Sequence, residues 1–154
     1  MLSEEQTTRL RPNVVSLQSI AGAMIIASTL AASVIAMISE WDELGDPLSM
    51  LPLIGAVFGL LMIGSGIVFP LVFAGEFATG DSEEEKIKSA AHAVTIEYLV
   101  RFSLVEAALF TNLLVLMLDL HSLTLGIVGF AIVTFLFLFP FQSNFVTSVE
   151  QRLK

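Results

Sequence analysis

The chain has 154 residues, of which 55% are hydrophobic and 14% are charged, and its formal net charge is −8 at pH 7. A soluble domain carries about 25% charged residues, so this composition favours a protein whose surface faces lipid. The negative charge argues against nucleic acid as a partner, because nucleic acids select basic surfaces. The absence of cysteine excludes disulfides, thiolate metal ligands and a cysteine nucleophile.

Four apolar segments along the chain are each long enough to cross a bilayer. A helical span needs about 20 apolar residues, and backbone groups in lipid must bond within their own segment, which favours helices. We therefore predict an all-α integral membrane protein, an antiparallel four-helix bundle that forms one domain. The predicted spans cover about 14–38, 51–77, 98–118 and 123–141, and a short amphipathic segment follows at 143–154.

The third predicted helix is longer than the span it contains. Ser82 followed by Glu85 is typical of a capping box, in which each side chain binds the backbone N–H of the other residue. The helix would then run from Glu83 to about Leu118, which is about 54 Å and exceeds the ~30 Å hydrocarbon core. We therefore expect its first turns to extend into the cytoplasm.

Basic residues are found on alternate connections only. Six of them precede the first span, lie between the second and third spans, or follow the fourth: Arg9, Arg11, Lys86, Lys88, Arg152 and Lys154. The other two connections, 39–50 and 119–122, contain neither Lys nor Arg. The positive-inside rule therefore places both termini and the middle connection in the cytoplasm, and it predicts a multi-pass protein of the cell (inner) membrane.

Small residues recur along the first two spans. Those of the first span are four residues apart, at Ser19, Ala23, Ala27 and Ala31. Those of the second span are glycines: Gly55, Gly59, Gly64 and Gly66. Small side chains let helices approach closely in lipid, which suits either packing within the bundle or self-association of the chain.

Glu106 lies deep within the third span. If Tyr98 marks the interface, Glu106 lies eight residues further along, or about 12 Å deeper, near the middle of the hydrocarbon core. An ionised side chain there costs at least ~2.5–3.5 kcal/mol and usually marks an ion path or a buried partner. We expect a neutral acid that either fixes packing or handles a proton or cation, and a side chain that snorkels to the headgroups is a third alternative. The hydroxyls expected to support it are Ser28, Thr29, Ser33 and Thr134.

The nearest positive charge in sequence is Arg101, five residues from Glu106. Five residues turn a helix by about 140° beyond one full rotation, so these two side chains do not share a face. Arg101 instead follows Glu97 at the favourable i, i+4 spacing. We therefore predict an ion pair between Glu97 and Arg101 near the cytoplasmic interface.

The segment Phe102–Leu118, with the sequence FSLVEAALFTNLLVLML, resembles the ion-carrying helix of rotary ATPase proteolipids (subunit c). In that family, an acid followed by small residues lies in mid-helix, after a glycine-rich partner helix and a cytoplasmic loop. The resemblance implies that Glu106 carries a proton or a sodium ion. The arrangement of Arg101, Glu106 and Phe110 also resembles uncharacterised four-span bacterial membrane proteins, and that resemblance implies no activity.

The sequence contains no group of residues spaced for catalysis. A Ser-His-acid triad, a metal-ligand motif and a phosphate-binding glycine loop are all missing, so we expect neither an enzyme nor a bound metal or cofactor. The leading interpretation is a structural or accessory membrane subunit that assembles with itself or with a membrane-protein partner. The alternative is proteolipid-like translocation of a proton or cation by Glu106.

Overall fold

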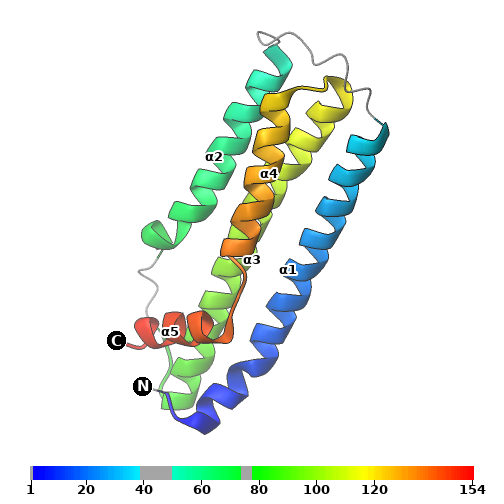
Figure 1. Cartoon of the computed structure of the whole chain (residues 1–154). Coiled ribbons are helices and arrows are strands. Elements are labelled where there is room, and N and C mark those ends of the chain that lie inside the picture. The colour runs from blue at the N-terminus through cyan, green and yellow to red at the C-terminus, as the bar shows by residue number, and fades with distance from the viewer. Residues whose placement is uncertain (1, 39–49, 74–77) are drawn as a thin grey trace.

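The computed structural model describes residues 2–38, 50–73 and 78–154, and for residues 70–73 it describes only the backbone. Figure 1 shows the long helices side by side, with a short helix crossing them near the end where both chain termini lie. The prediction of an all-helical fold is confirmed, since the described residues form helices and no strand. The helices are α1 (Glu4–Ile38), α2 (Met50–Phe73), α3 (Glu83–Leu118), α4 (Ser122–Phe137) and α5 (Gln142–Arg152).

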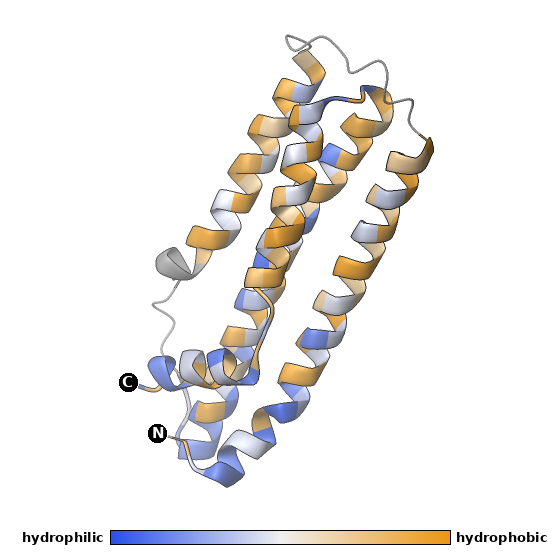
Figure 2. Cartoon of the chain, in the orientation of Figure 1, coloured by the Kyte–Doolittle hydropathy of each residue, from blue (hydrophilic) through white to orange (hydrophobic). Residues whose placement is uncertain are grey.

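Three of the described helices are long and apolar enough to cross a membrane: α1, α2 and α3. A fourth crossing is added if α4 and α5, which meet at a bend of 71°, count as one span. Figure 2 shows that apolar residues cover most of the long helices and that hydrophilic residues gather at the end near the termini. The structure therefore supports a membrane protein with three to four spanning helices.

The helix α4 is shorter than the span predicted for it. It has 16 residues, or about 24 Å, and ends at Phe137, four residues before the predicted limit of 141. Pro140 explains the early end, because proline lacks a backbone N–H and disfavours a helical conformation in the residue before it. By contrast, α1 begins at Glu4, ten residues before its predicted span.

The helix α3 is the central element, and α1, α2, α4 and α5 all contact it. The predicted capping box at its start is present: Glu85 N–H donates to Ser82 Oγ, and Ser82 N–H donates to Glu85 Oε2, both at 3.2 Å. Hydrogen bonds from the backbone N–H groups of Asp81 and Ser82 hold the pKa of the Glu85 carboxyl below its usual range. This end of α3 is therefore fixed by its own local sequence.

A buried amide and two glycines determine how α2 contacts α3. Asn112 is fully buried, and its Nδ2 donates to the carbonyl oxygens of Gly55 at 3.0 Å and Ala108 at 2.8 Å. A Cβ on Gly59 would lie 2.5 Å from Asn112 Nδ2 and 2.7 Å from Ile127 Cγ2. Gly55 and Gly59 therefore serve packing within the fold.

The other two glycines of α2 differ from each other. A Cβ on Gly66 would lie 3.4 Å from the carbonyl oxygen of Arg101, so this glycine also faces α3. A Cβ on Gly64 would meet nothing within 4 Å. Gly64 therefore makes no close helix contact among the described residues, although the sequence groups it with the others.

We expect Gly59→Ala to destabilise the fold by about 1–3 kcal/mol, because the added methyl group overlaps close-packed neighbours. Gly64→Ala is the matched control, since it has open space and alanine favours a helix by up to about 1 kcal/mol over glycine. Thermal unfolding of both variants in detergent micelles, followed by circular dichroism, measures the difference. Equal melting temperatures would contradict the close approach of α2 to α3 at Gly59.

Candidate functional site

Glu106 lies on α3 with its carboxyl partly covered by neighbouring helices. Its Oε2 atom is buried and has no hydrogen-bond partner among the described residues. The stretches 12–38, 50–73 and 122–137 of the neighbouring helices contain no ionisable side chain. These helices therefore offer Glu106 no counter-charge, and the neutral acid is the less costly form in such surroundings.

Four hydroxyls were predicted to support Glu106, and three of them, those of Thr29, Ser33 and Thr134, form no hydrogen bond with it among the described residues. Thr134 Oγ1 donates to the carbonyl oxygen of Phe130 at 2.8 Å, and Ser33 Oγ donates to that of Thr29 at 2.8 Å. Thr29 and Ser33 are also exposed on the outer face of α1. These hydroxyls are therefore either bonded within their own helices or turned outward.

Ser28 differs from the other three hydroxyls. It is 3% exposed, and its Oγ atom has no hydrogen-bond partner within the part of the chain that the structure describes. Ser28 lies on α1, which packs against α3. It is therefore the predicted partner that remains available to Glu106, although no direct hydrogen bond joins the two side chains.

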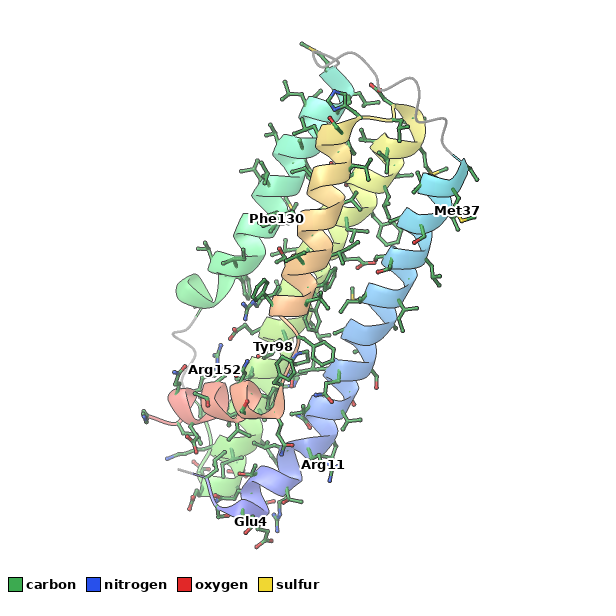
Figure 3. All side chains as sticks on the ribbon, viewed as in Figure 1. Glu4, Arg11, Met37, Tyr98, Phe130 and Arg152 are labelled. Carbon is green, nitrogen blue, oxygen red and sulfur yellow. The ribbon has the colours of Figure 1, made fainter. Side chains whose placement is uncertain are left out.

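A second polar cluster lies nearer the chain termini and joins α3 to α5. Glu97 Oε2 lies 2.8 Å from Arg152 Nη2, and Glu97 Oε1 lies 3.5 Å from Arg101 Nη1. The three side chains are only 8–17% exposed, so these ion pairs are largely shielded from solvent. Figure 3 shows Arg152 on α5, close to Tyr98 at this end of the molecule.

The sequence predicted the pair between Glu97 and Arg101, and it missed Arg152. The two partners of the missed pair are 55 residues apart, so no local spacing indicates their contact. The available signal was the apolar stripe of α5, where Phe145 and Val149 are fully buried. A helix that buries this stripe brings Arg152, three residues after Val149, to the same side.

Arg101 also connects this cluster to α2. Its Nε donates to the carbonyl oxygen of Gly66 at 3.1 Å, and its guanidinium carbon lies 5.8 Å from the centre of the Tyr98 ring. Tyr98 in turn stacks on Phe145 of α5 with ring centres 6.2 Å apart. The cluster therefore links α2, α3 and α5, and its role is to hold α5 across the end of the bundle.

A polar cavity of about 680 Å³ lies between the first turns of α1 and α3, and its lining includes Arg9, Glu84 and Lys88. These charges pair with one another: Arg9 lies 3.3 Å and Lys88 lies 3.5 Å from Glu84 Oε1. All three side chains are at least 61% exposed, so such pairs contribute little to stability. The described residues include no cluster of three or more His, Asp or Glu side chains placed to hold a metal.

Comparisons with protein-family models, curated proteins and solved structures give no match to this chain. The resemblance to rotary ATPase proteolipids therefore depends on the residues around Glu106 alone. Any function for the chain must be argued from its own geometry.

We expect Arg152→Gln to loosen α5 at a cost of about 1–3 kcal/mol, because Glu97 would lose a charged donor in a shielded position. Lys154→Gln is the matched control, since Lys154 is exposed and also lies at the end of the chain. Amide hydrogen exchange of residues 142–152, measured by mass spectrometry, should be faster in Arg152→Gln only. The same exchange in both variants would contradict the role of the ion pair in holding α5.

Proposed function

We propose that the chain is a multi-pass protein of the cell (inner) membrane, folded as an antiparallel four-helix bundle with both termini in the cytoplasm. The segregation of Lys and Arg onto alternate connections supports this orientation. The hydrophilic end in Figure 2, where α5 and the first turns of α3 lie, would then face the cytoplasm. The shielded cluster around Glu97 would lie near the cytoplasmic interface, where arginine side chains are best tolerated.

The role that the geometry favours is a structural or accessory subunit that assembles through the outer face of α1. This proposal is carried by a stripe of small residues on the exposed surface of α1, which has no counterpart among the described exposed side chains of α2. On α1, the small residues Ser19, Ala23 and Ala27 are exposed at four-residue spacing. The exposed side chains of α2 include large aliphatic ones, at 51–62% exposure for Leu53, Ile54, Val57, Leu60 and Leu61. Beside its small stripe, α1 also exposes Ile26, Leu30 and Val34, at 56–62%.

This contrast matters because lipid tails and helix interfaces favour different side chains. Helices that meet within a membrane are enriched in small and hydroxyl-bearing residues, which allow close packing. The hydroxyl of Ser19 is already bonded to the carbonyl oxygen of Val15 at 2.9 Å, so packing rather than hydrogen bonding would hold the contact. The small stripe of α1 suits another helix, from a second copy or a partner membrane protein, whereas the large aliphatic side chains exposed on α1 and α2 suit lipid.

Cysteine crosslinking tests this assembly directly, because the natural chain contains no cysteine. Mild oxidation of native membranes should join Ala23→Cys to a second copy, because the outer face of α1 would lie against the same face of its neighbour. Leu61→Cys, at a position 62% exposed on α2, is the matched control and should stay monomeric. A partner protein would give an adduct of different mass, and Ala23→Cys that crosslinks no more than the control would contradict the proposal.

A second candidate function is the handling of a proton or cation by Glu106. The buried Oε2 atom without a partner among the described residues favours it, as does the lack of ionisable side chains in the stretches 12–38, 50–73 and 122–137 of the neighbouring helices. An acid placed in this way within a span is expensive to keep unless it has a use.

Proton flux into liposomes that contain the purified chain tests this second function. Glu106→Gln should abolish the flux and also the labelling of the protein by a hydrophobic carbodiimide, because the amide cannot take up or release a proton. Glu85→Gln is the matched control, since glutamine can also complete a capping box. Liposomes with the unmutated chain that show no flux above empty liposomes would end this candidate.

A further inference from the structure

Four buried side-chain polar atoms lack a hydrogen-bond partner within the described ranges. Two of them, Ser28 Oγ of α1 and Glu106 Oε2 of α3, lie on helices that pack against each other. The other two are Asn112 Oδ1 of α3 and Thr124 Oγ1 of α4. Buried polar atoms in native proteins nearly always bond to protein or to ordered water. Ser28 lies on a face of α1 that stays covered on both sides of it, since Ala21 and Ile35 are 0% and 6% exposed. A single explanation for Ser28 Oγ and Glu106 Oε2 requires that they lie near each other.

Counted along the two helices from a contact near their starts, Ser28 and Glu106 lie at similar distances from the end of the molecule where the termini lie. Both helices run away from the end where the termini lie (Figure 1), and Arg9 Nη1 donates to Glu84 Oε1 there at 3.3 Å. The stretch of α3 from Glu84 to Glu106 is only three residues longer than the stretch of α1 from Arg9 to Ser28. Three residues are about 4.5 Å of helix, less than one turn.

Helix periodicity relates the direction of each of the two side chains to that of a residue near the start of its own helix. Leu10 and Lys88 line the same cavity between the first turns of α1 and α3. Ser28 follows Leu10 at the same sequence separation at which Glu106 follows Lys88. This separation amounts to about five full turns of an α-helix, so each later residue points in the direction of the earlier one.

The helix α4 borders the same position. The rings of Phe102 on α3 and Phe135 on α4 lie 6.1 Å apart, and these two helices run in opposite directions (Figure 1). Four residues forward on α3 and four residues back on α4 bring Glu106 to the level of Ala131, which is fully buried. A small, fully buried residue of α4 therefore lies at the level of Glu106.

We propose that Ser28 and Glu106 form one polar site between α1 and α3, in which a single water molecule joins the Ser28 hydroxyl to the protonated Glu106 carboxyl. A buried water typically makes two to four hydrogen bonds, and it can accept from the acid while it bonds to the hydroxyl. Calcium and magnesium take six or more oxygen ligands, whereas the two side chains supply only a hydroxyl and a carboxyl. Ser28 is thus a positioning residue for the acid.

This inference shares Glu106 with the second candidate function and deepens it, because the bridging water is the group to which the acid would release its proton. The site itself does not require transport. It would hold its water in a protein whose only role is assembly, where the bridge would join α1 to α3.

Infrared spectroscopy of the full chain in lipid nanodiscs at neutral pH tests the site. The carbonyl stretching band of a protonated carboxyl is expected, and its loss in Glu106→Gln assigns it. In the unmutated chain, this band should have the frequency of a hydrogen-bonded acid. Ser28→Ala should shift it to the higher frequency of a more weakly bonded acid, whereas Ser33→Ala, which removes an exposed hydroxyl of the same helix, should not move it.

Several outcomes would overturn the proposal. These are an unchanged band in Ser28→Ala, the frequency of a free acid in the unmutated chain, and no band that depends on Glu106. Loss of the band on addition of sodium or potassium at constant ionic strength would show a bound cation in place of the water. If Ser28→Ala does not fold, the frequency in the unmutated chain decides the question. A shifted band without proton flux would keep the site and end the transport function.

Discussion

The rest of the structure depends on the polar side chains of α3, because a polar group in lipid must find its partner within the protein. Asn112 bonds to the backbone of Gly55 on α2, and Glu97 binds Arg152 on α5. Apolar contact alone provides little preference in a membrane, since lipid tails pack against leucine as readily as another helix does. These two directed contacts therefore determine which face of α2 and which face of α5 is turned toward α3.

The small residues of α2 and α1 differ in burial: Gly59 packs against other helices, whereas Ala23 and Ala27 are exposed. Gly59 admits the side chains of Asn112 and Ile127 to distances that a Cβ would forbid, so it allows the contact on which the Asn112 hydrogen bonds depend. Ala23 and Ala27 are exposed instead, so within the described residues they do not allow a close contact of this kind. The sequence alone does not distinguish the two sets, and only the contacts show which small residues pack inside the fold and which are exposed.

What could be predicted from the sequence is what depends on neighbours within about one helical turn. The start of α3 followed from the capping chemistry of Ser82 and Glu85, and the Glu97–Arg101 pair followed from its i, i+4 spacing. The pair between Glu97 and Arg152 could not be predicted, because the path of the chain between them decides it. Asn112 was missed although an amide within an apolar helix is itself a signal, since it requires a partner from another helix.

Two acids of α3, nine residues apart, illustrate how position determines the chemistry of a carboxyl in this fold. Glu97 lies where two arginines reach it, so its charge is matched and the cost of its burial is offset. Glu106 lies beside stretches of α1, α2 and α4 that carry no ionisable side chain, so these stretches offer it only neutral groups. The Glu97 carboxyl holds one end of the fold together. The Glu106 carboxyl has a buried oxygen without a hydrogen-bond partner among the described residues, and in the proposed site Ser28 satisfies it through a water molecule.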